Sequence, residues 1–549
     1  MATINFKGKE IVRNYHLSVP YHELRPDMKK GLSKKPSLND NLIIHGDNLL
    51  ALKALLPTYA GKVKCIYIDP PYNTGNEKWA YNDNVNSPMM KEWLGKVVDK
   101  DDLTRHDKWL CMMMPRLKLL RELLSDDGAI FVSIDDNEQH HLRDLMDDVF
   151  GEENFITNVI WQKKYSPQND ANYFSDMHDF ILVYAKHKNI SNERTGWIRN
   201  LLQRTEEMNE RYSNPDNDPR GDWKPSDLSA KRVTPKDIYE IITPSGRKVL
   251  PPRGRSWAIS KDRFKELMRD NRIWFGETKN NIPSLKRFRS DVQEGFVPLT
   301  IWLRDEVGDN QEAKQELKEI FIDSDLPFET PKPVRLIKRI LELCVDRDSI
   351  ILDSFAGSGT TAHATLALNK EDGGNRKFIL VEMEEYADKI TAERVRRVIK
   401  GVPASAKATA GKKGESLRSG LGGSFSYFEL GKPIDVGRIL KGEDLPSFVE
   451  MARYIFYTAT GEEFNEKRID EKTGFIGESK EYKVYLLYKP NMEYLKNTAL
   501  TLDWAQKLGK FTGKKRLVFA PTKYLDHEHL ERLGIEFAQL PFDIYKRAE

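Results

Sequence analysis

VKCIYIDPPYNTG, residues 63–75, joins a short apolar run to a loop that contains two adjacent prolines. The run over residues 63–68 is β-branched and apolar, which predicts a buried strand. The prolines end that strand because they lack a backbone N–H for the sheet. Open α/β sheets bind their ligands at the carboxyl ends of strands. This stretch therefore predicts an α/β fold with a functional loop directly after the strand.

The residues of this loop suit chemistry on an exocyclic amino group of a nucleobase, whose lone pair is delocalised into the ring. The Asp69 carboxylate and the Pro70 carbonyl can both accept hydrogen bonds from such an amine. Tyr72 offers a flat face on which a base flipped out of a duplex can stack. Pro70 and Pro71 would hold these groups in place. The alternative is an ordinary turn, since Asp and Pro are common turn residues.

A second motif, residues 349–361, is typical of a strand, a glycine turn and the start of a helix. Its apolar run ends at Asp353 and is followed by Phe355-Ala356-Gly357-Ser358-Gly359-Thr360. Glycines let the backbone approach a ligand closely, and a helix N-terminus offers free amide donors. The motif lacks the lysine of a phosphate-binding P-loop, so it does not indicate a triphosphate site.

Two further apolar runs end in polar residues. Residues 377–381 lead into Glu382, at about the spacing where a carboxylate binds the ribose hydroxyls of an adenosine cofactor. Residues 41–45 lead into Gly46-Asp47. Four strands that each end in a polar or glycine-rich loop would line one edge of a single sheet.

The order of the two loops resembles that of DNA amino-methyltransferases that use S-adenosylmethionine. Within that class, the chain resembles the modification subunit of a type III restriction-modification system. The likeness extends to residues 41–85, 115–117, 128–136 and 330–333. It implies that Asp69, Pro70, Pro71 and Tyr72 are catalytic. It also implies a cofactor site made of Asp47, Lys332, Asp353, Phe355, Ala356, Gly357, Ser358, Gly359, Thr360 and Glu382.

The resemblance implies an α/β fold: a permuted Rossmann-like methyltransferase sheet with an inserted target-recognition domain and a small C-terminal α/β domain. The reaction would be methyl transfer to adenine N6 in duplex DNA by base flipping, because Asp rather than Ser opens the loop in most adenine enzymes of the family. Three alternatives stay open: cytosine-N4 methylation, RNA base methylation, and a DNA-binding specificity subunit that retains the methyltransferase scaffold. The resemblance also implies a homodimer and a restriction (nuclease/helicase) subunit as a partner.

Composition limits the remaining function classes. The chain has 549 residues, too many for one core, and its 87 basic residues almost balance its 84 acidic ones. Any nucleic-acid surface must therefore come from local clustering of charge. The 3 cysteines lie far apart and outside any Pro-Cys loop, which argues against disulfides, structural zinc and cytosine ring-carbon methylation. We find no apolar signal segment and no run of about 18 apolar residues, so we expect a cytoplasmic protein without membrane spans.

The pattern along the chain predicts six segments. They are an N-terminal arm (1–40), a catalytic half (41–186), a target-recognition domain (187–329), a cofactor-loop half (330–400), a linker (401–421) and a C-terminal accessory or assembly domain (422–549). The linker is basic and low in complexity, so it fits either a contact with the DNA backbone or a plain connection.

Basic residues alternate with aromatic ones within residues 187–329, a mixture that suits DNA recognition. A loop-rich domain with solvated charges is the alternative. The predicted DNA contacts are Arg253, Arg255, Trp257, Arg272, Lys286 and Arg287.

The pair His140-His141 resembles a metal-binding motif only superficially. Asp135, Asp136 and Glu138 lie beside it, and such a charged cluster is typical of a solvated helix start. The sequence therefore predicts no metal site.

Overall fold

The computed structural model describes residues 4–74, 104–167, 172–189, 196–322, 328, 330–403, 416–434, 445–511 and 513–540. It divides into two compact units. The first combines Met1–Asn200 with Thr300–Glu549, and the second is the insertion Leu201–Leu299.

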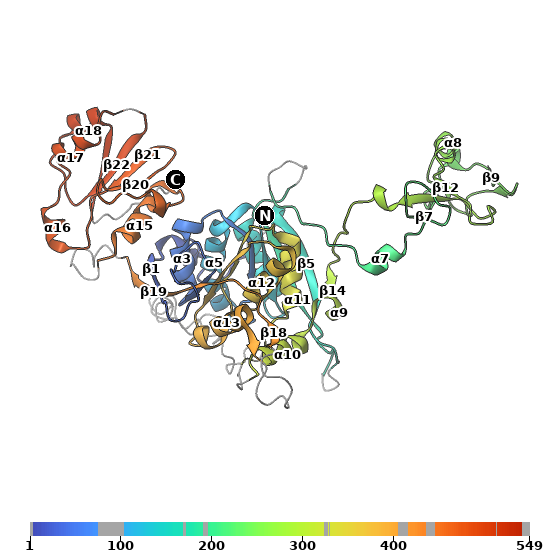
Figure 1. The fold of residues 1–549 in the computed structure, drawn as a ribbon, viewed down its shortest axis with the longest axis horizontal. Helices are drawn as coiled ribbons and strands as arrows, with labels where there is room; N and C mark the ends of the chain where they lie inside the picture. The colour runs from blue at the N-terminus through green and yellow to red at the C-terminus, as the bar shows by residue number, and fades with distance from the viewer. Residues whose placement is uncertain are drawn as a thin grey trace. The chain divides into compact units, whose positions relative to one another are not determined.

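Among the described residues, ten strands form the main sheet of the first unit (Figure 1). Their order across the sheet is β1 (His22–Pro26), β19 (Ser426–Pro433), β2 (Leu42–His45), β16 (Lys377–Glu382), β15 (Ile350–Asp353), β3 (Val63–Ile68), β4 (Leu124–Ile134), β6 (His178–Ala185), β5 (Phe155–Gln162) and β14 (Ile301–Trp302).

The four predicted strands β2, β16, β15 and β3 are neighbours and run parallel. Their carboxyl ends therefore meet at one edge, as predicted. In the register, Asp353 pairs with Leu380 and Glu382 pairs with His45. The α/β class is confirmed. The loop after β15, which contains Gly357 and Gly359 and is called the glycine loop below, follows a strand adjacent to β3.

Side chains alternate between the two faces of the sheet, and helices cover both faces. Ile44 and Ile379 pack in one core with residues of α3 (Asn48–Tyr59), α5 (Arg105–Leu123) and α6 (Gln139–Phe150). Ile43 and Phe378 point the other way, into a core with α10 (Asn310–Ile320), α12 (Thr360–Asp372) and α13 (Glu393–Lys400). The first unit is thus a three-layer α/β/α arrangement.

The remaining helices of this region include α11 (Val334–Cys344), which is buried along one side and packs against α12 and the sheet. The others are short, namely α1 (Lys9–Val12), α2 (Tyr15–Ser18), α9 (Arg304–Val307) and the π-helical turn Ala387–Ala392.

The predicted domain boundaries differ from the observed ones in three places. The separate insertion is narrower than residues 187–329, because β14 pairs with β5 and α10 packs in the main core. The N-terminal arm contributes β1, and the segment assigned to the C-terminal domain contributes β19. These two strands cover what would otherwise be an unpaired edge of β2.

The insertion contains short strands around a small core of its own, which includes Leu228, Tyr239, Trp257, Leu267 and Phe275. Its elements are α7 (Glu206–Glu210), β7 (Trp223–Asp227), β8 (Ser229–Ala230), β9 (Ile241–Ile242), β10 (Lys248–Val249), β11 (Ser256–Trp257), α8 (Lys261–Arg269), β12 (Ile273–Trp274) and β13 (Ser284–Phe288).

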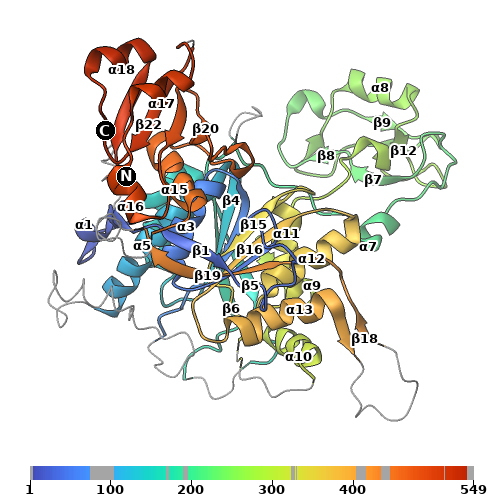
Figure 2. The same ribbon diagram turned by 60° about the vertical axis from the view of Figure 1, so that its left-hand side comes forward.

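The C-terminal region forms a second sheet in the order β20 (Phe475–Glu478), β21 (Tyr482–Leu486), β22 (Lys515–Ala520) and β23 (Ile535–Gln539), drawn in red in Figure 2. It is accompanied by α15 (Phe448–Thr460), α16 (Met492–Asn497), α17 (Leu502–Lys507) and α18 (His527–Leu533). Buried cores lie on both faces, as expected of a small α/β domain. The hairpin β17 (Gly401–Pro403) with β18 (Ser416–Ser419) precedes it.

No helix within the described ranges is both long enough and apolar enough to span a bilayer.

Candidate active site

The loop after β3 and the loop after β15 line the same cavity, although they are far apart in sequence. The cavity has a volume of about 400 Å³. Asp69, Pro70, Pro71 and Tyr72 form part of its wall, and residues 355–358 form another part. The sheet brings them together because β15 is the parallel neighbour of β3.

Asp69 has one engaged oxygen and one open oxygen. Its Oδ2 forms an ion pair with Lys332 Nζ, which lies 5.2 Å from the centre of the Tyr72 ring. Its Oδ1 is buried and has no hydrogen-bond partner among the described residues. A buried carboxylate oxygen left in this state can accept a hydrogen bond from a ligand amine.

The backbone of this loop is held from α5. Trp109 donates its indole N–H to the carbonyl oxygen of Pro71 at 2.7 Å. Burial, together with the charge of Asp69, raises the pKa of the Tyr72 phenol well above its ordinary value. Tyr72 therefore stays protonated at neutral pH and presents a neutral aromatic ring to the cavity.

The glycine loop is held by side chains behind it. Gly357 has φ 51°, a left-handed conformation that strains most side chains, and its N–H donates to Glu382 Oε2 at 2.7 Å. The hydroxyl of Thr391 donates to the Gly357 carbonyl at 2.6 Å. Gly359, with φ 80°, is the residue before the first turn of α12. These contacts fix the shape of the loop before any ligand binds.

Asp353 is a buried acid at the end of β15. It accepts hydrogen bonds from the Thr361 hydroxyl at 2.5 Å and from the Phe355 N–H at 3.1 Å. Burial raises the pKa of Asp353 to about 7, and the negative charge of Asp69 acts in the same direction. This carboxyl group therefore titrates near neutral pH at the wall of the cavity.

Sequence reasoning missed four charged residues of the cavity wall: Asp135, Lys163, Lys164 and Asp179. Lys163 Nζ donates to Asp179 Oδ1 at 2.6 Å, and both side chains are buried. Burial raises the pKa of Asp179, and the charge of Lys163 opposes that shift. The signal in the sequence was their position beside strands β4, β5 and β6, which share the sheet with β3.

Most of the predicted cofactor residues line the cavity, namely Lys332, Asp353, Phe355, Ala356, Gly357, Ser358 and Thr360. Asp47, Gly359 and Glu382 do not line it. Asp47 caps α3 by accepting from the N–H groups of Leu49 and Leu50 at 2.9 and 3.2 Å.

Two of the predicted DNA contacts are buried, so the prediction that they lie on the surface is wrong. Trp257 is 1% exposed and donates its indole N–H to the Tyr239 carbonyl, and Lys286 is 1% exposed and pairs with Asp218. Both belong to the core of the insertion, because a basic-aromatic pattern does not distinguish a buried ion pair from a solvated one.

The other four predicted contacts are accessible to different degrees. Arg255 pairs with Asp227, and Arg272 pairs with Asp270 and Asp291. Arg253 and Arg287 are exposed.

The interpretation of residues 135–141 as a solvated helix start is wrong for Glu138. The helix α6 does begin there, but the Glu138 side chain is fully buried and bonded to His106 and His141.

Comparison with known proteins assigns the class. Residues 63–393 match the family model described as DNA methylase. The chain therefore belongs to the DNA methylase family.

Its relatives include both type III and type II enzymes. It is 35% identical over 434 residues to the type III restriction-modification enzyme StyLTI Mod subunit of Salmonella typhimurium, an alignment that covers 74% of this chain and 64% of that subunit. It is 33% identical over 392 residues to the type II methyltransferase M.KpnI of Klebsiella pneumoniae, covering 66% of this chain and 84% of that enzyme. The chain thus spans slightly less than two thirds of the length of the Mod subunit.

Among solved structures, the PvuII DNA methyltransferase (cytosine-N4-specific) matches with a TM-score of 0.33 and 12% identity, covering 66% of this chain and 87% of that one.

Proposed function

We propose that this chain is an S-adenosylmethionine-dependent DNA methyltransferase that modifies adenine N6, as the modification subunit of a type III restriction-modification system. One observation carries the proposal: the Asp-Pro-Pro-Tyr loop and the glycine loop line a single cavity. Membership of the DNA methylase family and the similarity to a Mod subunit support it.

In this mechanism the chain activates the target amine by hydrogen bonding. Asp69 Oδ1 and the Pro70 carbonyl accept the two amine hydrogens, which draws the nitrogen toward tetrahedral geometry and frees its lone pair. Asp69 then takes the proton that the methylated nitrogen must lose. Tyr72 stacks on the flipped base, a contact worth about 1–3 kcal/mol. Lys332 is paired with Asp69 Oδ2, so it holds the carboxylate in place with Oδ1 left for the amine.

The residues present fit the cofactor. The left-handed Gly357 leaves the loop backbone without a side chain at the cavity wall, and α12 begins directly behind the loop. Residues 355–358 and Thr360 would hold S-adenosylmethionine, which supplies the methyl group as an electrophile attached to sulfur. Glu382 would act by holding the Gly357 N–H rather than by lining the cavity.

The choice of adenine rests on Asp69, because Asp rather than Ser opens the loop in most adenine enzymes of the family. We assign recognition of double-stranded DNA to the insertion Leu201–Leu299, whose exposed Arg253 and Arg287 are suited to phosphate or guanine contacts. The proposal includes a homodimer and a restriction subunit as partner, both in keeping with a type III system.

Single-molecule sequencing of DNA from a host that expresses the chain tests the reaction and its site together. We expect N6-methyladenine in one short sequence context, absent when Asp69→Ala is expressed at the same level. N4-methylcytosine in that context would replace the adenine assignment. A folded chain that binds S-adenosylmethionine and DNA but modifies neither base would instead identify a specificity subunit. Sedimentation at several concentrations, with and without site DNA, tests the dimer.

A further inference from the structure

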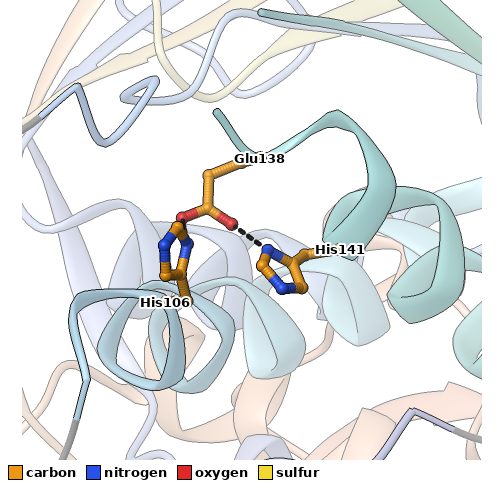
Figure 3. A group of neighbouring side chains, drawn as sticks. All are labelled: His106, Glu138 and His141. Carbon is orange, nitrogen blue, oxygen red and sulfur yellow. Dashed lines mark hydrogen bonds and ion pairs between the residues drawn. The ribbon is translucent and has the colours of Figure 1, made fainter. Parts of the chain in front are cut away.

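Three hydrogen-bond donors surround one buried carboxylate beside residues 69–74, which we call the catalytic loop. Glu138, the residue before the first turn of α6, is 0% exposed. Its Oε1 accepts from His106 Nδ1 at 2.7 Å, and its Oε2 accepts from His141 Nδ1 at 2.9 Å. Figure 3 shows the two imidazole rings on either side of the Glu138 carboxylate.

The third donor is Asn73, the residue that follows Tyr72. Its side-chain amide donates to Glu138 Oε1 and also lies 3.3 Å from the carbonyl oxygen of Arg105. Asn73 is 5% exposed and has φ 56°, a left-handed conformation in which Asn is among the tolerated residues. Glu138 thus connects the end of the catalytic loop to the first turn of α5.

Two histidines and a carboxylate are also a possible ligand set for a metal ion. The hydrogen bonds indicate that protons, and not a metal ion, lie between these three side chains. His106 Nε2 accepts from the Arg105 guanidinium at 3.3 Å, and because that group can only donate, the His106 proton sits on Nδ1, facing Glu138. The separations of 2.7 and 2.9 Å are also shorter than the roughly 3.3 Å between ligand atoms around a tetrahedral zinc ion.

We propose that Glu138 is a positioning residue for methyl transfer: by holding Asn73, it fixes the backbone that carries Asp69 and Tyr72. The loop is then clamped twice from one helix, since Trp109 of α5 holds the Pro71 carbonyl and the first turn of α5 is tied to Glu138. Glu138 does not line the cavity, and burying its carboxylate without partners would be unfavourable. Its three hydrogen bonds offset that cost. This role rests on the proposed function.

Glu138→Gln is the direct test, because glutamine keeps the shape but has only one accepting oxygen and turns an N–H group toward a donor. We expect the single-turnover methylation rate on site DNA to fall about 10–100-fold, since displacements of reacting groups by about 1 Å have that cost. The Kd for S-adenosylmethionine should change less than threefold, because residues 355–358 are held by other contacts. Asp136→Asn, an exposed carboxylate two residues away, is the matched control and should keep the wild-type rate.

Asn73→Gly isolates the connection to the loop, because glycine adopts the same φ without supplying the amide. It should lower the rate by a similar factor, and the double variant Glu138→Gln with Asn73→Gly should be no slower than the slower single variant. Hydrogen exchange of the backbone amides of residues 72–74 should rise in both single variants and stay unchanged in the control. This readout does not depend on activity.

Unchanged exchange and an unchanged rate in a folded Glu138→Gln chain would overturn the positioning role. Additive losses in the double variant would overturn its route through Asn73. About one zinc ion per chain, with activity lost to a chelator and restored by zinc, would replace it by a metal site. A wild-type chain that methylates no DNA would instead count against the proposed function, and the exchange experiment would still decide the role of Glu138.

Discussion

The edge of the main sheet and the insertion Leu201–Leu299 differ in how well their sequences predict their functional side chains. At the sheet edge, most of the predicted residues of two distant loops meet at one cavity. In the insertion, six predicted contacts divide into two buried residues, two ion-paired arginines and two exposed arginines.

The difference has a physical cause. At the sheet edge, backbone chemistry fixes position: prolines and glycines restrict the loops, and parallel pairing places their strand ends together. In the insertion, the same residue types serve the core and the surface. A lysine among acids can be a buried partner, as Lys286 is, or a free cation. Composition therefore indicates the role of the unit but not of each side chain.

The largest expected effect tests the sheet edge. Asp69→Ala should lower the methylation rate by about 10²–10⁴-fold, the range for losing a group that takes part in proton transfer. The Kd for S-adenosylmethionine and for DNA should stay within a few fold, because Asp69 acts on the amine. Single-turnover methylation together with calorimetry would measure both, and Asp69→Asn is the volume-matched variant. An equal loss of DNA affinity and rate would contradict the assigned role.

Because prolines, glycines and parallel strand pairing restrict the sheet edge, much of the first unit could be predicted from the sequence, but not all of it. The four adjacent parallel strands follow from their apolar runs. Strand β19 and strand β1 could not be assigned to the sheet, because their partners lie hundreds of residues away and their apolar pattern is weak. Glu138 was missed because full burial of a carboxylate depends on donors from Asn73, His106 and His141, which only the fold brings together.

The second prediction tests the buried side of the insertion. Lys286→Ala should destabilise this unit by about 3 kcal/mol, the lower end for a broken buried ion pair, because Asp216 loses its cation while Arg220 still pairs with Asp218. Denaturant-dependent hydrogen exchange of the β13 amides would measure the loss. Lys231→Ala, at an exposed position, should change stability by less than about 0.5 kcal/mol. Equal effects of the two substitutions would mean that Lys286 is not a core residue.

The third prediction uses the raised pKa of Asp353. In the folded chain the pKa of Asp353 is about 7, whereas in the unfolded chain it is near 3.8. The folded state therefore binds more protons between these values, and its stability relative to Asp353→Asn should fall as pH rises from about 4 to 7, by at most about 4 kcal/mol in total, and then level off.

Unfolding in denaturant at several pH values between 4 and 8 would measure that difference. Asp348→Asn changes an exposed carboxyl on the same segment and should show no such slope. A constant difference in the free energy of unfolding between wild type and Asp353→Asn across this range would show that the pKa of Asp353 is not raised.

The smallest expected effect sharpens the comparison on the exposed side of the insertion. Arg287→Ala should weaken binding to site DNA by about 1–3 kcal/mol and relax one position of the site if Arg287 reads a base. If it contacts phosphate, binding to every sequence should weaken alike and the salt dependence should fall by about one ion. Arg272→Ala is the matched comparison, because Asp270 and Asp291 already engage that guanidinium and its loss should cost less affinity. Fluorescence anisotropy with site and non-site duplexes at several salt concentrations distinguishes these results. A larger loss for Arg272→Ala than for Arg287→Ala would show that the ion-paired arginines, and not the exposed ones, form the DNA surface.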